Sequence, residues 1–237
     1  MNDDLMDKVE LFYESSYRTE GINAQRQWPN EELCRFMGRN YFHLEKSKRK
    51  DISILEVGCD SGCNLKMLVK EGFDVYGVDL SKEAIDLLPF IVDDADYNHF
   101  LVGDMTKMPF ESECFNCVID VFSSFCLNEL QYEEYIKECY RTLKKNGKIF
   151  SYVPSKKSDA FINYEPASKL DASTLDGIHR TTSPYYGNFY PFRFMSRDDV
   201  KRVCGDLFEI TYMENIGRTY NGGREYFAFL VFELVKR

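Results

Sequence analysis

Two glycines and one aspartate have the types and the spacing of a ligand-binding turn. Gly58 and Gly62 stand between an apolar run, residues 54–57, and a segment with helical character. A glycine lets the backbone approach a ligand because it carries no Cβ. Asp79 follows Gly58 by 79 − 58 = 21 positions, close to the roughly 20-residue offset at which a strand-end carboxylate accepts hydrogen bonds from ribose hydroxyls. The spacing therefore predicts a ligand that contains a ribose.

The middle of the turn indicates which ribose-containing ligand fits. A dinucleotide site has the pattern G-x-G-x-x-G, which places a pyrophosphate on a helix N-terminus. Here the three positions are Gly58, Asp60 and Gly62, so an aspartate stands where a middle glycine is expected. Its carboxylate would repel a pyrophosphate at close range. A ligand with a cationic amino group suits this turn better.

Three further segments continue the pattern in order. Residues 56–62 are followed by Val78-Asp79-Leu80-Ser81, by Gly103-Asp104-Met105 and by residues 115–120. Together they resemble the S-adenosylmethionine site of class I methyltransferases, and the resemblance covers residues 51–154. It implies a Rossmann-like fold, S-adenosyl-L-methionine as the cofactor and a methyltransferase activity.

The resemblance also implies which residues bind the cofactor. The first motif would hold its amino acid end, Asp79 its ribose, and Asp104 with Met105 its adenine. The residues expected from the four motifs are Glu56, Gly58, Cys59, Asp60, Gly62, Asp79, Leu80, Ser81, Asp104, Met105, Asp120 and Val121. Seen alone, Asp104 fits a helix cap better than a ligand site, and Asp120 fits a solvated loop residue better. Their common place at successive strand ends, where open α/β sheets bind ligands, favours the site.

The elements that must position these residues alternate along the chain. Strands are expected over 52–57, 74–78, 99–102, 115–121 and 148–153, and helices over 63–71, 81–88 and 128–143. This alternation predicts a parallel sheet. Residues 208–220 and 225–235, joined by Asn221-Gly222-Gly223, predict a final antiparallel hairpin. The fold class is thus α/β, a Rossmann-like class I methyltransferase fold with a mostly parallel seven-stranded sheet.

The composition favours one domain and a small-molecule substrate. The chain of 237 residues is 44% hydrophobic and 15% aromatic, enough for one sizeable core. We expect a single domain over 1–237, with a helical lid (1–50), a cofactor-binding core (51–154), a lid insertion (155–195) and a C-terminal helix and hairpin (196–237). A net charge of −9 argues against a nucleic-acid partner.

The cysteines and the N-terminus indicate a reducing compartment. Eight cysteines are scattered along the chain, and Cys114 and Cys117 lack the second ligand pair of a metal site. We expect reduced thiols and no metal. The start of the chain is polar at Asn2, Asp3 and Asp4, and no apolar run has the length of a membrane helix. These features predict a cytoplasmic protein with no membrane partner.

The N-terminal lid contributes candidates that rest on the resemblance. In bacterial small-molecule methyltransferases, similar N-terminal regions close over the cofactor with tyrosines and arginines. Tyr13, Tyr17 and Arg26 are therefore candidates for cofactor binding. Trp28, the only tryptophan, lies in the loop between the two predicted helices. It would either line the substrate site or pin the N-terminal helices to the domain.

The insertion of residues 155–195 provides candidates for substrate binding and catalysis. It is rich in aromatic side chains with a few cations, which suits a lid that excludes water and recognises an acceptor; an ordinary packed insertion is the alternative. His179 is the candidate general base, by elimination among three histidines, although a surface or hydrogen-bonded structural histidine is the more common case. Asp120 would hold a hydroxyl or amine. The candidate substrate-binding residues are Trp28, Arg180, Tyr185, Tyr186 and Tyr190.

These observations favour a small-molecule methyltransferase that acts on a hydroxyl rather than an amine, with a sugar-containing compound or a secondary metabolite as the acceptor. A protein or RNA methyltransferase is the nearest rival, although Asp120-Val121-Phe122-Ser123 stands where such enzymes have Asn-Pro-Pro-Tyr. An inactive cofactor-binding module and an NAD-dependent oxidoreductase are less favoured. Exposed aromatic residues in both lids would allow a homodimer to complete the site.

Overall fold

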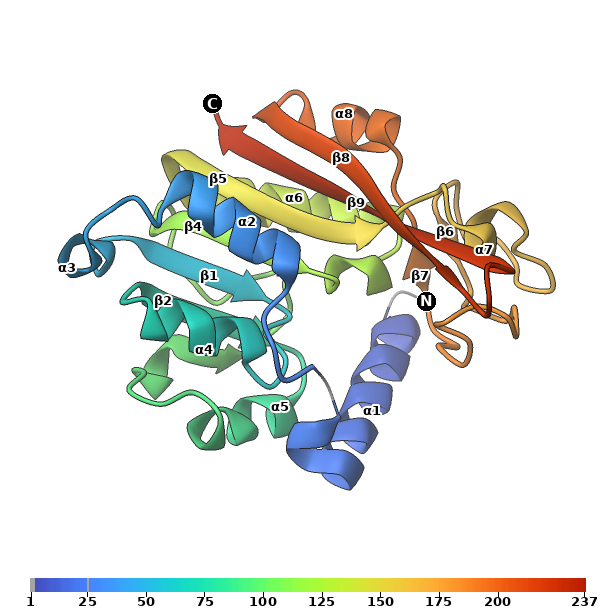
Figure 1. The fold of residues 1–237 in the computed structure, drawn as a ribbon, viewed down its shortest axis with the longest axis horizontal. Helices are drawn as coiled ribbons and strands as arrows, with labels where there is room; N and C mark the ends of the chain where they lie inside the picture. Colours follow the sequence, from blue (N-terminus) through green and yellow to red (C-terminus); the bar gives the residue numbers. More distant parts are fainter. Residues whose placement is uncertain (1–2, 25) are drawn as a thin grey trace.

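The computed structural model describes residues 3–24 and 26–237, with side chains from residue 8 onward. Seven strands form one sheet in the order β3-β2-β1-β4-β5-β9-β8 (Figure 1). Neighbouring strands from β3 to β5 are parallel, whereas β9 is antiparallel to both β5 and β8. The strands are β1 (Ser53–Val57), β2 (Asp74–Asp79), β3 (Phe100–Val102), β4 (Phe115–Val121), β5 (Leu143–Pro154), β8 (Phe208–Tyr220) and β9 (Glu225–Lys236). The predicted fold class is confirmed.

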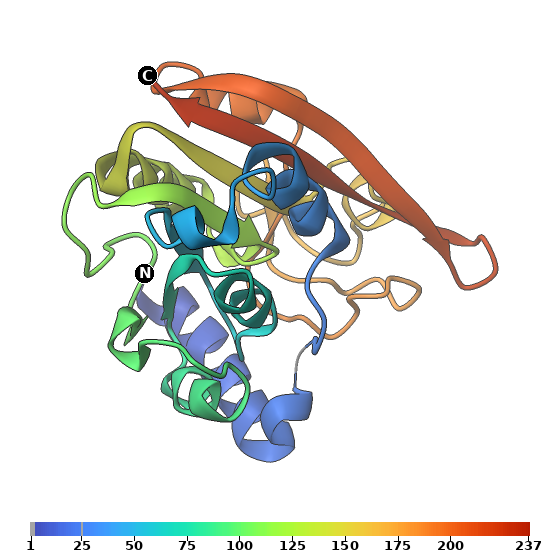
Figure 2. The same cartoon turned by 60° about the vertical axis from the view of Figure 1, so that its left-hand side comes forward.

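The strand order reverses beside β1, which has β2 on one side and β4 on the other. Ligands of open α/β sheets bind at such a point, outside the carboxyl ends of the strands. The final hairpin extends this edge of the sheet, because its turn lies well beyond the end of β5 (Figure 2).

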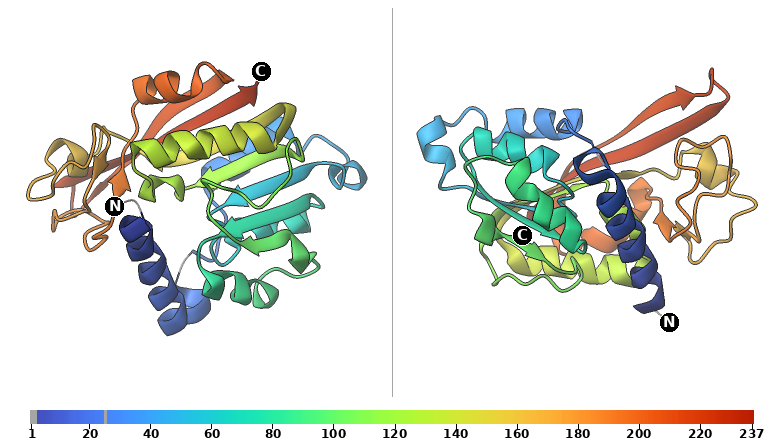
Figure 3. Two further views of the ribbon diagram at one scale, coloured as in Figure 1. Left: turned by 180° about the vertical axis from the view of Figure 1, so that it is seen from behind. Right: turned by 90° about the horizontal axis from the view of Figure 1, so that it is seen from below.

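Helices cover both faces of the sheet. Alternate residues of a strand point to opposite faces, so Ile54 and Phe150 pack with α2 and α4, whereas Leu55 and Ile149 pack with α6 and α8. Figure 3 shows α6 and α8 behind the sheet of Figure 1. The longer helices are α1 (Asp3–Glu20), α2 (Glu31–Asn40), α4 (Cys63–Lys70), α5 (Lys82–Leu87), α6 (Glu129–Thr142) and α8 (Arg197–Cys204). Shorter ones are α3 (Lys46–Arg49), α7 (Asp159–Ile162), η1 (Gly21–Asn23), η2 (Leu88–Phe90), η3 (Tyr97–His99) and η4 (Ser124–Cys126).

One predicted boundary is wrong in an informative way. The chain pairs with β4 from Leu143, five residues earlier than the expected strand start at Lys148. Leu143 pairs with Phe115 and Lys148 with Cys117, so the residues between them bulge out of the ladder. Asn146, with φ of 61°, makes the left-handed turn within this bulge. Residues 144–147, which lie between the expected helix and the expected strand, therefore form a bulge inside β5.

Two segments border the carboxyl edge of the sheet. Helix α1 stands beside the ends of the parallel strands, and residues 155–195 lie beyond the end of β5 with a small sheet of β6 (Thr174–Leu175) and β7 (Phe192–Arg193) (Figures 1 and 3). None of the eight cysteines is paired in a disulfide in this structure. Among the described residues, none of the helices has the length and apolar character needed to cross a membrane.

Candidate functional site

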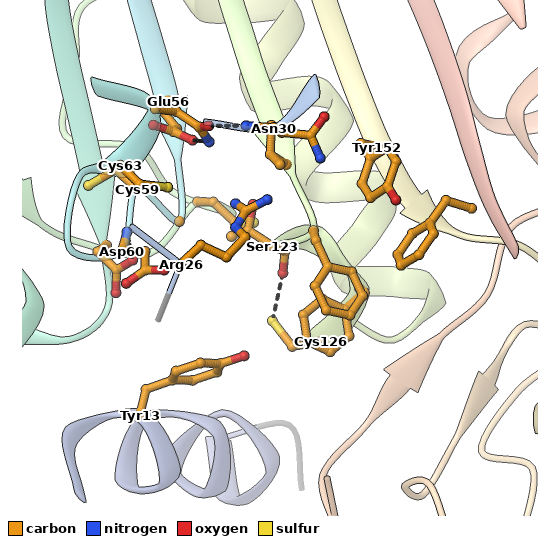
Figure 4. Close-up of a pocket in the computed structure, with 18 of the residues that line it drawn as sticks. Tyr13, Arg26, Asn30, Glu56, Cys59, Asp60, Cys63, Ser123, Cys126 and Tyr152 are labelled. Carbon is orange, nitrogen blue, oxygen red and sulfur yellow. Dashed lines mark hydrogen bonds between the residues drawn. The ribbon is translucent and has the colours of Figure 1, made fainter. Parts of the chain in front are cut away.

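A cavity of about 500 Å³ lies at the carboxyl edge of the sheet, within the size range of small-molecule sites. Its walls come from α1, the segment before α2, the turn after β1, the ends of β2 and β4, and the final hairpin. Figure 4 shows Tyr13 of α1 facing the strand ends across this space. Among the described residues, no group of three or more His, Cys, Asp or Glu side chains has the geometry of a metal site.

The two glycines of the turn are required by packing within the protein. Gly58 has φ of 59°, and a Cβ there would lie 2.3 Å from the Cβ of Ser123. Gly62 has φ of 87°, and a Cβ there would lie 2.5 Å from Leu88 and 2.8 Å from Val92. Gly58 lines the cavity but Gly62 does not. The second glycine therefore serves the close approach of α4 to η2 rather than ligand contact.

Asp60 keeps the conformation that a middle glycine would have. Its φ is 57°, a value that non-glycine residues rarely adopt. Its carboxylate accepts hydrogen bonds from the backbone N–H of Ser61 and from the hydroxyl of Tyr17 on α1, and these bonds offset the cost of the conformation. Burial raises the pKa of Asp60 to about 7. The aspartate thus preserves the turn and fixes α1 to it.

Asp79 closes the turn from the neighbouring strand. Its Oδ2 accepts from the backbone N–H of Asp60 and its Oδ1 from that of Ser81, both at 2.9 Å. Burial raises its pKa above the ordinary value. The side chain lines the cavity, and each carboxylate oxygen can accept a further hydrogen bond. Asp79 can therefore organise the turn and still bind a ligand hydroxyl.

Glu56 presents a buried carboxylate to the cavity. Its Oε1 accepts from Asn64 Nδ2 at 2.6 Å, and Asn64 Oδ1 in turn accepts from the backbone N–H of Asn30 at 3.0 Å. Asn30 caps α2 by accepting from the N–H groups of residues 32 and 33. Glu56 is 2% exposed, and its Oε2 has no partner among the described residues. Burial raises its pKa to about 8.

The opposite half of the cavity is aromatic. Tyr152 stacks on Phe229 with ring centroids 4.2 Å apart, and Tyr185 lies 5.1 Å from Phe122. We call these four side chains the aromatic wall. Burial raises the pKa of both tyrosines well above the ordinary value, so they are neutral hydroxyls at physiological pH. Arg218 of β8 lines the same half.

Most of the predicted cofactor-binding residues meet at the cavity. Those that line it are Tyr13, Arg26, Glu56, Gly58, Cys59, Asp60, Asp79, Leu80, Met105 and Val121, together with Tyr17. Gly62, Ser81, Asp104 and Asp120 do not. Ser81 caps α5, and Asp104 accepts from the N–H of Thr106. Asp120 is fully buried and accepts hydrogen bonds from Ser123 and Ser124, so the structure places it behind the cavity lining.

The predicted catalytic and substrate-binding residues lie mostly outside the cavity, and Tyr185 is the one that lines it. His179 packs on Phe189 and lies 3.5 Å from Asp176, away from the cavity. Arg180 forms an ion pair with buried Glu225 at 2.8 Å. These partners satisfy both side chains within the insertion and the hairpin. The placement of His179 therefore does not support a general base.

The aromatic candidates Trp28, Tyr186 and Tyr190 also have other surroundings. Trp28 is 82% exposed and does not line the cavity. Tyr186 is half exposed and packs edge-on against Phe189. Tyr190 is buried, with its hydroxyl 3.3 Å from that of Tyr13. Tyr190 thus contacts Tyr13, which lines the cavity, whereas Trp28 and Tyr186 face solvent.

The final hairpin supplies lining residues that the sequence interpretation missed. Ile216, Arg218 and Tyr220 line the cavity from β8, and Phe229 lines it from β9. The signal is the spacing of alternate residues, which places 216, 218 and 220 on one face of a strand. This spacing does not by itself identify a binding site, because the strands of any C-terminal hairpin have the same alternation. Asn30, Asn64, Phe122 and Tyr152 were missed as well.

The comparisons with known proteins agree with this geometry. Residues 55–151 match the family model of a methyltransferase domain. The chain carries a methyltransferase domain. This match spans the strands from β1 to β5, which place Glu56, Asp79 and Val121 at the cavity. The methyltransferase domain therefore contains the cofactor-facing half of the site, and the N-terminal helices and the hairpin lie outside the match. No curated protein matches the chain significantly.

Solved structures similar to this chain show the same fold. A protein from Pyrococcus horikoshii has 21% identity and a TM-score of 0.64, covering 94% of this chain and 99% of its own. A SAM-dependent methyltransferase from Methanosarcina mazei has 18% identity and a TM-score of 0.65, with coverage of 88% and 98%. The 1,6-didemethyltoxoflavin-N1-methyltransferase of Burkholderia thailandensis, solved with its substrate and S-adenosylhomocysteine, has 12% identity and a TM-score of 0.63, with coverage of 100% and 90%. The fold is therefore that of SAM-dependent methyltransferases.

Proposed function

We propose that this protein is an S-adenosylmethionine-dependent methyltransferase that transfers a methyl group to a hydroxyl or amine of a small molecule. The observation that carries the proposal is the cavity at the switch point of the sheet, lined by Glu56 and Asp79 at one end and by aromatic side chains at the other. We further propose that residues 1–237 act as one domain, since α1, the insertion and the hairpin all contribute lining residues.

The cofactor end of the cavity fits S-adenosylmethionine. The buried Oε2 of Glu56 has no partner among the described residues, and a buried carboxylate without a partner is costly. A ligand ammonium would supply the missing charge and the missing hydrogen bonds. Asp79 can accept bonds from ribose hydroxyls, and Leu80 and Met105 offer apolar contacts for the adenine. Arg26 is the cation that would hold the carboxylate of the methionine end.

The chain's own residues position and shield the reactants. S-adenosylmethionine, when bound, supplies a methyl group on a positively charged sulfonium. Alignment of an acceptor with such a group contributes a large share of the rate in a displacement reaction. The aromatic wall provides a rigid surface for that alignment, and Tyr13 with α1 covers the cavity and limits the access of water. The neutral hydroxyls of Tyr152 and Tyr185 can donate hydrogen bonds to an acceptor oxygen or nitrogen.

The form of the cavity supports a small acceptor over a macromolecule. Side chains from α1, from residues 26–32 and from the hairpin surround the strand ends. A volume of about 500 Å³ leaves room for the cofactor and one compact molecule beside it. The net charge of −9 is also unfavourable for binding a nucleic-acid backbone.

Calorimetric titration with S-adenosylmethionine, S-adenosylhomocysteine and NAD tests the proposal. The first two ligands should bind and NAD should not. Asp79→Asn should weaken the binding of both S-adenosyl ligands, because the amide replaces one acceptor oxygen with a donor. Asp74→Asn is the matched control, since Asp74 lies at the other end of β2 and outside the cavity lining. Binding of NAD alone, or equal losses in the two variants, would contradict the proposed function.

A further inference from the structure

The two halves of the cavity differ in charge. The acidic residues Glu56, Asp60 and Asp79 gather at the turn between β1 and α4 and at the end of β2. The other half is formed by the aromatic wall and by β8, which contributes Arg218. Arg218 lines the cavity and is exposed, and none of the ion pairs among the described residues includes it. A cation is therefore available where the acceptor would bind.

The carboxylates nearest to this half are already engaged. Glu31 forms an ion pair with Arg35 at 2.7 Å, and Glu32 lies 3.4 Å from the same guanidinium. The charge of Arg218 reaches Glu31 and lowers its pKa, although the bond from Arg35 is the main cause. Arg218 also acts on Tyr152 and Tyr185, whose pKa values burial raises. Arg218 is thus placed between the aromatic wall and α2.

Arg26 occupies the middle of the cavity. Its charge acts on Glu56 and Asp60 at the cofactor end and on Tyr152 and Tyr185 at the other end. Figure 4 shows its side chain between Asp60 and Ser123. Among the described residues, Arg26 and Arg218 are the two cationic side chains that line the cavity, and both act on the tyrosines of the aromatic wall. An aromatic site with carboxylates would favour a cationic amine, whereas these positions favour a negative group.

We propose that the acceptor is an aromatic molecule with an anionic group, held by its ring against the aromatic wall and by its charge on Arg218. The proposal rests on the proposed function, because it names the substrate class of the same cavity. The ring faces of Tyr152 and Phe229 supply stacking area. The guanidinium supplies paired donors that match a carboxylate. Arg218 is then a specificity-determining residue rather than part of the methyl-donor site.

Binding of three fluorescent probes to protein saturated with S-adenosylhomocysteine tests this assignment. Hydroxynaphthoate is the aromatic acid, hydroxynaphthamide its neutral counterpart and naphthylmethylamine the cation. The wild-type protein should bind the acid at least about tenfold more tightly than either of the others, as expected for one charge-assisted hydrogen bond. Arg218→Gln should weaken binding of the acid by about 10- to 100-fold and leave binding of the amide nearly unchanged. Arg218→Lys should retain part of the preference.

Matched controls separate this inference from the proposed function. Arg224→Gln changes an arginine of the same hairpin that lies outside the cavity lining and bonds to the carbonyl of Asn221; it should bind the acid as the wild type does. Arg218→Gln should also retain its affinity for S-adenosylhomocysteine. Equal affinity for acid and amide, tighter binding of the amine, no binding of the acid, or equal losses in the two arginine variants would overturn the inference. Failure of the wild type to bind S-adenosylhomocysteine would instead refute the proposed function.

Discussion

Replacing Glu56 with glutamine should weaken S-adenosylhomocysteine binding without disturbing the fold. The Oε1 of the glutamine can keep the bond from Asn64 Nδ2 that Glu56 accepts at 2.6 Å. Its amide nitrogen would then occupy the place of Oε2, which is buried at the cavity. An N–H donor there faces the ligand ammonium in place of an anion. Loss of a charge-assisted hydrogen bond costs about 1.5–3 kcal/mol, which is about a 10- to 150-fold weaker affinity.

The pH dependence of binding is a second and more specific test of whether the Glu56 carboxylate binds the ligand ammonium. Burial raises the pKa of Glu56 to about 8, so at pH 7 about nine in ten of these carboxyls carry a proton. A bound ammonium favours the ionised form and expels that proton. Affinity should therefore rise with pH below 8, by about 25-fold between pH 6 and pH 7.5 if the pKa in the complex falls below 6. Above pH 8, the part of the pH dependence that Glu56 causes should disappear, because the free protein then already carries the ionised carboxylate.

Calorimetry in two buffers of different ionisation enthalpy measures the released proton. The wild type should release close to one proton at pH 7, and the Glu56→Gln variant should release almost none. The ligand's own amine titrates equally in both experiments. The difference in proton release between the two proteins therefore reports Glu56 alone. Equal proton release in both proteins, or a wild-type affinity that does not change with pH, would refute the assignment of Glu56 to the ligand ammonium.

Three other substitutions test the parts of the site separately. Gly62→Ala should destabilise the protein by about 2–5 kcal/mol in urea unfolding, because a left-handed residue costs about 1–2 kcal/mol and the new Cβ, 2.5 Å from Leu88, adds an overpacking cost of about 1–3 kcal/mol; a change below about 1 kcal/mol would contradict this packing. Tyr17→Phe removes the hydroxyl bonded to Asp60, so amide exchange in α1 should become faster, and unchanged exchange would show that α1 is held by other contacts. His179→Ala should leave the affinities for S-adenosylhomocysteine and hydroxynaphthoate within about twofold, since His179 lies outside the cavity lining; a larger loss would return it to the site.

The cofactor-facing half of the site could be predicted from the sequence because its signals are local. A strand, a glycine turn and a strand-end carboxylate are adjacent in the chain and adjacent in space. Thus Glu56, Gly58 and Asp79 meet at the cavity as expected. The parallel sheet could be predicted from the alternation of strands and helices along the chain, and β4 has the predicted bounds. Residue types at fixed spacings along the chain are enough to indicate these features, even though packing against Ser123 also requires the glycine at position 58.

The acceptor half could not be predicted because its residues are distant in the chain. Phe122, Tyr152 and Phe229 come from three strands or their ends, and they meet because β5 lies between β4 and β9 in the sheet. The aromatic content of the insertion suggested a substrate lid, but most of those rings pack together; Phe192 and Phe194 are fully buried, for example. Composition does not distinguish a ring that packs in a core from one that lines a cavity.

The aspartate in the glycine turn links the methyl-donor site to the lid. A glycine at position 60 would adopt the same φ without strain, but it would offer no side chain to α1. With Asp60 present, one carboxylate holds the hydroxyl of Tyr17, while the backbone N–H of the same residue is held by Asp79. Any ligand that repositions Asp79 therefore acts on the residue that anchors α1. The departure from a glycine pattern thus ties the turn to Asp79 on one side and to Tyr17 of α1 on the other, through two hydrogen bonds of a single residue.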